Sequence, residues 1–205
     1  MSSYYYLVAQ LPYLVYGQSV PMSSAVFKGL CRELLSASEV ALLDACTLDV
    51  EAEGAGVEDA SYREVPCATA SPFIDAWRNW ERALRLQLAR YRAQRLKREG
   101  GAPVDPPEEP QEVVALAKAA LVLDSPLEAE LFLDQSRWNA IEALQGGVYF
   151  HANTIYAYLL KLLLMERRSS FRLEEGFAEY KGLYAAIMER GGGNVPISIE
   201  SGEPK

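Results

Sequence analysis

The hydrophobic positions of this chain recur mostly at helical spacing, most clearly between residues 71 and 98. With successive residues placed 100° apart, the apolar side chains of this segment fall within about 80° of one another. They are Phe73, Trp77, Trp80, Leu84, Leu88 and Tyr91. Beyond Tyr91 the same sector is occupied by Arg95 and Arg98. We therefore predict one long helix over about 72–98, with Trp77 and Trp80 buried and with Arg95 and Arg98 exposed.

A second segment, residues 150–168, is apolar around nearly its whole circumference, apart from a seam of Thr154, Lys161 and Arg168. Such a helix is normally surrounded by others, so we predict that it is central. Further helices are predicted over 111–123 and 127–145. Another one-sided apolar stripe predicts a helix over 173–188.

Three helix starts, one of them a further helix after Ser36, have recognisable signals. Ser36 and Glu39 have the spacing of a capping box, in which each side chain satisfies a backbone amide of the other residue. Ser125 and Glu128 repeat this spacing. Ser71 and Ser125 each precede a proline, which is favoured at the first helical position because its missing N–H has no partner there.

Less regular segments separate these helices. Residues 49–70 are acidic and aperiodic, residues 99–110 combine glycines with four prolines, and residues 191–205 have a flexible composition, so we predict loops and a tail. The aromatic start, YYYLVAQLPYLVYG, fits either a short helix ending near Pro12 or a strand, and is expected to dock against other elements. The whole predicts an all-α helical bundle, as a single domain over 1–190 or as two lobes, 1–98 and 111–190.

Charge distinguishes the long helix from the rest of the chain. Between Pro72 and Arg98 seven arginines and Lys97 face only Asp75 and Glu81, giving +6 within a chain of 205 residues and net charge −8. The acidic remainder argues against general nucleic-acid binding, which needs a basic surface. Arginine and tryptophan are enriched at interface hot spots, so the segment suggests protein–protein contact.

The basic side chains of this helix are our interface candidates: Arg78, Arg82, Arg85, Arg92, Arg95 and Arg98. An acidic partner, or the chain's own acidic loops, could satisfy them. The alternative is a solvated flank whose aliphatic stems cover the apolar stripe, supported by Arg85 following Glu81 at i+4.

Three cysteines, Cys31, Cys46 and Cys67, fit a reduced cytosolic protein better than a disulfide framework, and we interpret them as structural. The N-terminus lacks the positive region of an export signal. The longest apolar run, residues 155–165, is shorter than the ~20 residues of a membrane span. We therefore expect a cytoplasmic protein.

Sequence motifs for chemistry are sparse. The one histidine, His151, has no metal-ligand spacing around it, and no phosphate-binding glycine loop occurs. We predict no catalytic, cofactor-binding or metal-binding residues, and favour a capping or packing role for His151. A weaker alternative is an enzyme whose site combines His151, Tyr156, Tyr158 and Lys161 along the seam of the apolar helix.

A resemblance adds to this interpretation. The ordered segments YYYLVAQLPYL, WRNWERALRLQLARYRAQRL, RWNAIEAL, IYAYLLKLLLMERRSSF and EEGFAEYKGLY resemble an uncharacterised bacterial family encoded in V-type ATPase operons. The likeness covers residues 1–190. Through that family the chain is distantly similar to the funnel-like helical subunit of A/V-type ATPases that joins the rotor stalk to the membrane ring.

The resemblance implies a non-catalytic cytoplasmic subunit or assembly factor of a V/A-type ATPase, an ion-transporting pump. It would be peripheral to the inner membrane through its complex, with rotor-stalk and membrane-ring subunits as partners. The funnel-like subunit has three helical lobes, whereas this chain is long enough for about two. The alternative from the residues alone is a stand-alone helical adaptor that binds an acidic protein or an anionic membrane surface.

Overall fold

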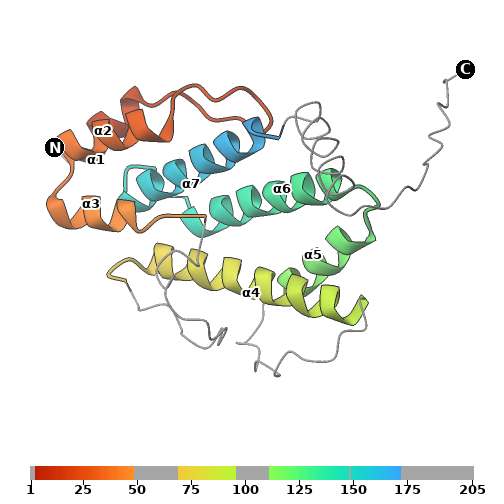
Figure 1. Cartoon of the computed structure of the whole chain (residues 1–205). Coiled ribbons are helices and arrows are strands. Elements are labelled where there is room, and N and C mark those ends of the chain that lie inside the picture. Colours follow the sequence, from red (N-terminus) through yellow and green to blue (C-terminus); the bar gives the residue numbers. More distant parts are fainter. Residues whose placement is uncertain (1–2, 49–68, 96–110, 148, 172–205) are drawn as a thin grey trace, which may run out of the picture. The chain divides into compact units, whose positions relative to one another are not determined.

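The predicted helical character is confirmed in the computed structural model, which describes residues 3–48, 69–95, 111–147 and 149–171. These ranges contain seven α-helices and no strand, so the fold class is all-α. The helices are α1 (Ser3–Gln10), α2 (Ser24–Leu34), α3 (Ala37–Asp44), α4 (Pro72–Arg95), α5 (Gln111–Val122), α6 (Pro126–Gln145) and α7 (Ala152–Ser169) (Figure 1). All seven, with α7 up to Arg168, belong to one unit, residues 1–168.

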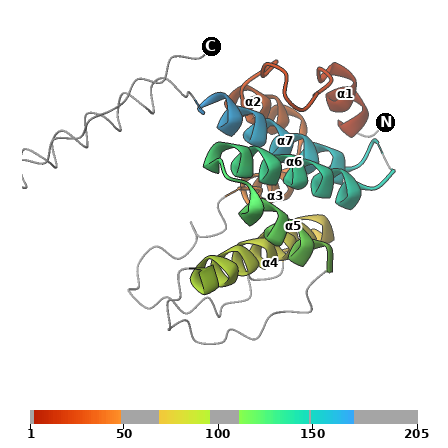
Figure 2. The same cartoon turned by 90° about the vertical axis from the view of Figure 1, so that its right-hand side faces the viewer.

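Within this unit α7 is central, as its apolar circumference predicted. The helices α1 and α2 lie on one side of α7 and α6 lies on the other, while α4 and α5 cover the far side of α6 (Figures 1 and 2). The C-cap of α3, Ala45, contacts α4. Eight residues of α7 are buried: Ile155, Tyr156, Ala157, Leu159, Leu160, Leu162, Leu164 and Met165. Ser24 at the start of α2 donates to both carboxylate oxygens of Glu166 on α7, at 2.7 Å each.

The long helix α4 also packs as its stripe predicted. Trp77 and Trp80 are 1% and 8% exposed, and their rings stack with centroids 5.8 Å apart. Arg95 at the end of α4 is exposed, which confirms that part of the prediction. Arg98 lies outside the described residues.

The aromatic N-terminus is a helix, which resolves the choice between helix and strand. The Tyr4 hydroxyl of α1 donates to Glu39 of α3, and Leu7 is buried. Tyr5 and Tyr6 are more than half exposed, so only one face of this segment is docked within the described part of the chain.

The loop between α1 and α2 is held by contacts with helices distant in sequence. The Tyr16 hydroxyl donates to the Leu131 carbonyl of α6 at 3.0 Å, and the guanidinium of Arg168 lies 4.9 Å from the Tyr16 ring centroid. The Tyr158 hydroxyl of α7 donates to the Pro12 carbonyl at 2.9 Å. Gly17 has φ of 87°, a left-handed conformation in which a side chain would be strained.

The predicted start signals are present. Ser36 and Glu39 form the reciprocal capping box. The Ser125 side chain accepts from the Glu128 amide, and the Ser71 hydroxyl accepts from the Ile74 amide at 3.5 Å.

Helix α2 was not among the predicted elements, although its residues carry a local signal. The Ser23 side chain caps it, and Phe27 and Cys31, one helical turn apart, are its buried positions. Burial raises the pKa of the Cys31 and Cys46 thiols to about 12, so both remain protonated near neutral pH. This burial agrees with a structural role for the two cysteines.

Several predicted features lie outside the described residues. They are the loops 49–68 and 99–110, Cys67, the helix over 173–188 and the tail 191–205. Whether residues 1–190 form one domain or two lobes also stays a prediction.

Replacing Ser36 with alanine should lower the free energy of unfolding by about 1 kcal/mol, because the Ser36 hydroxyl no longer accepts from the Glu39 amide or donates to the Glu39 carboxylate. Hydrogen bonds from Ser36 and Tyr4 lower the pKa of Glu39 below its usual 4.5. Glu39 therefore releases its proton more readily in the folded chain, and stability should rise with pH through the window just below 4.5. In Ser36→Ala this pH dependence should be weaker.

Urea unfolding of the wild type and Ser36→Ala, between about pH 3 and pH 6, measures both effects. The matched control is Ser19→Ala, which changes an exposed serine in the loop before α2. Equal pH slopes for wild type and Ser36→Ala would contradict the role of the box.

Candidate functional site

The arginines of α4 divide into two groups according to what they contact. Arg78 donates to the carbonyl of Ala45, the C-cap of α3, at 3.1 Å. Arg85 donates to the Leu48 carbonyl at 2.6 Å. Cations are favourable at a helix C-terminus, where carbonyls lack partners, so these two arginines fasten the end of α3 to α4.

The second group lies at the end of α4. Arg92 and Arg95 are exposed, and Arg95 donates to the Leu121 carbonyl near the end of α5 at 3.2 Å. Arg82 is half-buried and also has contacts within the chain. The five interface candidates that the structure describes thus do not form one surface, and the role of all six in binding a partner stays a prediction.

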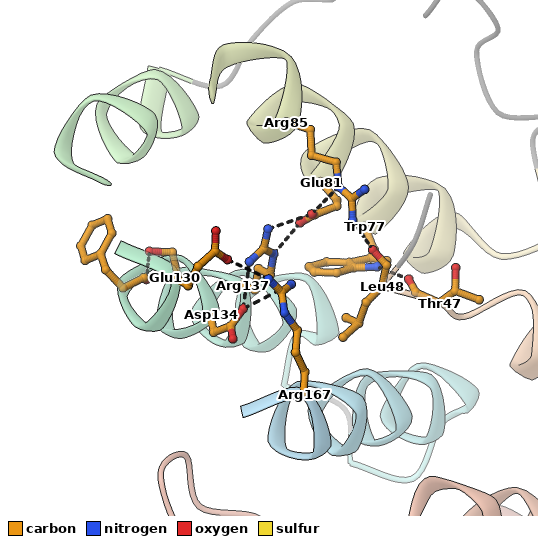
Figure 3. A network of polar contacts seen from close by, with 11 residues as sticks. Thr47, Leu48, Trp77, Glu81, Arg85, Glu130, Asp134, Arg137 and Arg167 are labelled. Atoms are coloured by element: carbon orange, nitrogen blue, oxygen red, sulfur yellow. Dashed lines mark hydrogen bonds and ion pairs between the residues drawn. The ribbon is translucent and has the colours of Figure 1, made fainter. Parts of the chain in front are cut away.

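A buried ionic network connects α4 to α6 (Figure 3). Arg137 on α6 donates two hydrogen bonds to Glu81 on α4, from Nε at 3.0 Å and from Nη2 at 3.1 Å. Its third nitrogen, Nη1, donates to Asp134 at 2.8 Å. Glu81 and Asp134 are 0% exposed and Arg137 is 5% exposed. Glu81 also accepts from Arg85 at 2.9 Å, so the network includes one of the interface candidates of α4.

The same network extends to α7. Nη1 of Arg167 lies 3.7 Å from Asp134, and Nη2 of Arg167 donates to Glu130 at 2.7 Å. Burial raises the pKa of Asp134 despite the lowering effect of Arg167 and Arg137. Its Oδ2 atom has no hydrogen-bond partner among the residues that the structure describes. This carboxylate is therefore the least well compensated charge of the cluster.

The sequence prediction missed this cluster because it treated Glu81 only as the local partner of Arg85. A signal was present in the spacing. Glu81 lies four residues after Trp77 and three before Leu84, at the edge of the apolar stripe. Arg137 lies four residues from both Leu133 and Ile141, within the apolar face of α6. A charged residue inside an apolar face must find a partner, and two such residues of opposite sign on different helices indicate a buried pair.

The residues of the alternative enzymatic site each have structural contacts. His151 accepts a hydrogen bond from the Asn153 amide at 3.3 Å through Nδ1, a capping contact at the start of α7. Burial raises the pKa of Tyr156 and of Tyr158 to about 12, which keeps both phenols neutral near pH 7. Lys161 pairs with Glu142 on α6 at 3.0 Å.

Lys161 and Tyr158 nevertheless border a half-open cavity of about 440 Å³, together with Pro12 and Glu142. Their pairing is therefore not enclosed in the core, and an enzymatic role for these residues stays a prediction. Among the described residues, no cluster of three or more His, Cys, Asp or Glu side chains could hold a metal ion. Within the same residues, no helix is both long and apolar enough to cross a membrane.

Comparison with known proteins gives no match: no protein-family model, curated protein or solved structure is significantly similar to this chain.

Proposed function

We propose that this chain is a non-catalytic cytoplasmic subunit or assembly factor of a bacterial V/A-type ATPase. In this role it couples the rotor stalk to the membrane ring through protein–protein contacts. The proposal begins from the resemblance of residues 1–190 to the family encoded in V-type ATPase operons. It requires a body that transmits force and a surface that binds neighbouring subunits.

The observation that carries the proposal is the division of α4 into two parts. Its first turns are fixed to α6 and α3, through Glu81 with Arg137 and through the arginines that hold the end of α3. Its last turn exposes Arg92 and Arg95. A helix held by its neighbours along its length, with exposed arginines at its end, suits a part that transmits force to an acidic neighbour.

A reciprocal purification tests the association. The chain carrying a C-terminal tag should co-purify with rotor-stalk subunits from detergent-solubilised membranes of the native organism, and a tagged protein of the stalk should capture the chain. The same tag on an unrelated helical cytoplasmic protein is the control. Absence of the chain both from the intact ATPase and from its assembly intermediates would refute the proposal.

Deletion of the chain separates a permanent component from an assembly factor. Loss of a permanent coupling component should abolish ATP-driven ion pumping while the soluble ATPase head still hydrolyses ATP. Loss of an assembly factor should instead reduce the amount of complete complex, with normal pumping per complex. Wild-type amounts of complex with wild-type pumping would contradict both roles.

The exposed arginines at the end of α4 also favour a second candidate, a stand-alone adaptor that binds an acidic protein or an anionic membrane surface. Binding of purified chain to vesicles containing anionic lipid that weakens with salt, without any ATPase association, would favour this function.

A further inference from the structure

A cleft lies at the ends of α4 and α5 and the start of α6. Its volume is about 250 Å³, and it is lined by Leu88 and Arg92 of α4, by Ala120 of α5 and by Leu133 of α6, among others. Leu88, Ala120 and Leu133 are buried, so they form an apolar floor. This volume can accommodate an apolar side chain of a partner.

Cationic groups border this floor. Arg92 and Arg95 line the cleft and are exposed, and Asp124 is the one carboxylate among the described lining residues. Arg95 uses one N–H on the Leu121 carbonyl, and a guanidinium has five such donors. The cleft therefore retains donors suited to carboxylate oxygens, which arginine binds in a bidentate manner.

The surface beside the cleft is unusually apolar for a solvated helix end. Val122 is 80% exposed, and Leu123, which itself lines the cleft, is 37% exposed. An apolar pocket, neighbouring exposed aliphatic side chains and arginines at the rim form the combination found at interface hot spots.

We propose that this cleft binds an acidic, amphipathic segment of a partner protein. An apolar side chain of the segment enters the cleft, and its flanking carboxylates pair with Arg92 and Arg95. Charge complementarity selects this occupant, because the chain has net charge −8 and attracts an acidic segment only where its cations are concentrated. The inference rests on the proposed function, and it gives the chemistry of the contact through which the chain would bind the ATPase.

The test uses the full-length chain and a fluorescently labelled synthetic peptide that forms a helix with a leucine face and a glutamate face. Binding is measured by fluorescence anisotropy. The wild type should bind this peptide but not the same peptide with lysine in place of glutamate. Binding should weaken between about 0.05 and 0.5 M salt. No binding of the acidic peptide by the wild type would overturn the proposal.

Arg90 offers a matched control, since it is exposed on the same helix but does not line the cleft. Arg92→Glu should weaken binding roughly tenfold or more, whereas Arg90→Glu should change it by less than about twofold. Equal losses in both variants would mean attraction to a basic helix in general and would overturn the assignment to the cleft. Circular dichroism should show wild-type helical content in both variants.

Filling the cleft tests its apolar floor independently of charge. Ala129→Phe, at a half-buried position of the lining, should also weaken binding roughly tenfold, because the added ring occupies the space of the partner's side chain. If Ala129→Phe is folded and binds as the wild type does, the cleft is not the site.

The acidic segment between α4 and α5 is the competing occupant. Neutralising it in Glu108→Gln with Glu109→Gln should leave peptide affinity within about twofold of wild type. A tenfold gain would show that the chain's own segment fills the cleft, which would overturn binding of a partner there.

The ATPase pull-down distinguishes this contact from the proposed function. ATPase association that survives Arg92→Glu unchanged would overturn the contact and uphold the proposed function. Peptide binding through the cleft without ATPase association would uphold the contact and overturn the proposed function.

Discussion

Replacing Arg137 with methionine should lower the free energy of unfolding by about 3–5 kcal/mol, because breaking a buried ion pair leaves uncompensated charges in the core. Glu81 would lose a bidentate partner and keep Arg85. Asp134 would lose its closest cation and keep Arg167 at 3.7 Å. Since a typical domain is stable by about 5–15 kcal/mol, this variant should be only marginally folded.

Urea unfolding at neutral pH measures this loss. The control Arg90→Met removes an exposed arginine from α4 and should change stability by less than about 0.5 kcal/mol. A loss below about 1 kcal/mol in Arg137→Met would show that solvent or nearby cations compensate the carboxylates, contrary to the burial described above.

A triple variant separates charge from packing. Combining Arg137→Met with Glu81→Leu and Asp134→Leu removes all three charges, and it should recover most of the lost stability because buried ion pairs can be replaced by apolar groups of similar volume. If the triple variant is as unstable as Arg137→Met alone, the defect lies in packing rather than in unpaired charge.

The network also predicts a pH dependence of known sign. Burial raises the pKa of Asp134 above its usual 3.8, so the folded chain holds this proton more tightly than the unfolded chain does. The contribution of Asp134 to stability therefore falls as pH rises above that value. Removing Arg137 takes away a cation that lowers this pKa, so the deficit of Arg137→Met should be smaller near pH 4 than at pH 7.

Replacing Trp77 with alanine should cost about 3–5 kcal/mol, which is the usual cost of removing a buried large aromatic side chain. Trp77 is 1% exposed, stacks on Trp80 and donates from Nε1 to the Thr47 carbonyl at 3.3 Å. The substitution therefore removes packing between α4 and the segment after α3. For a unit of this size the melting temperature should fall by roughly 10 °C.

Two further variants interpret that result. Trp77→Phe retains a ring but loses the hydrogen bond, so it should be less destabilising than alanine. Tyr13→Ala removes a ring that is 89% exposed and should change stability by less than about 0.5 kcal/mol. A Trp77→Ala variant within 1 kcal/mol of wild type would contradict the observed packing.

Helices with local signals were predictable from the sequence. The stripe of α4 and the all-round apolar character of α7 depend on residues within one helix, and the capping box of Ser36 needs only its own four residues. Helix α2 was missed because only Phe27 and Cys31 are buried in it. The N-terminal segment stayed ambiguous because aromatic residues suit strands as well as helices.

The site was less predictable, because its contacts are long-range. Glu81 and Arg137 are separated by 56 positions, and nothing local to Arg137 identifies Glu81 as its partner. Arg78 and Arg85 were predicted as candidate contacts for another protein, yet they bind carbonyls that follow α3, more than 30 positions away. Periodicity places a side chain on a helix face but does not say which element covers that face.

The tethering of the N-terminal helices to α7 has a consequence for synthesis. Pro12 and Tyr158 are 146 positions apart, and Ser24 and Glu166 are 142 positions apart. At 5–20 residues per second, a ribosome makes α7 roughly 7–30 s after α1. During that interval the loop after α1 and the buried Phe27 of α2, whose ring centroid lies 4.9 Å from that of Tyr158 in the folded chain, have no partner from α7. We therefore expect the nascent chain to depend on a holdase chaperone, and fragments that end before α7 to aggregate.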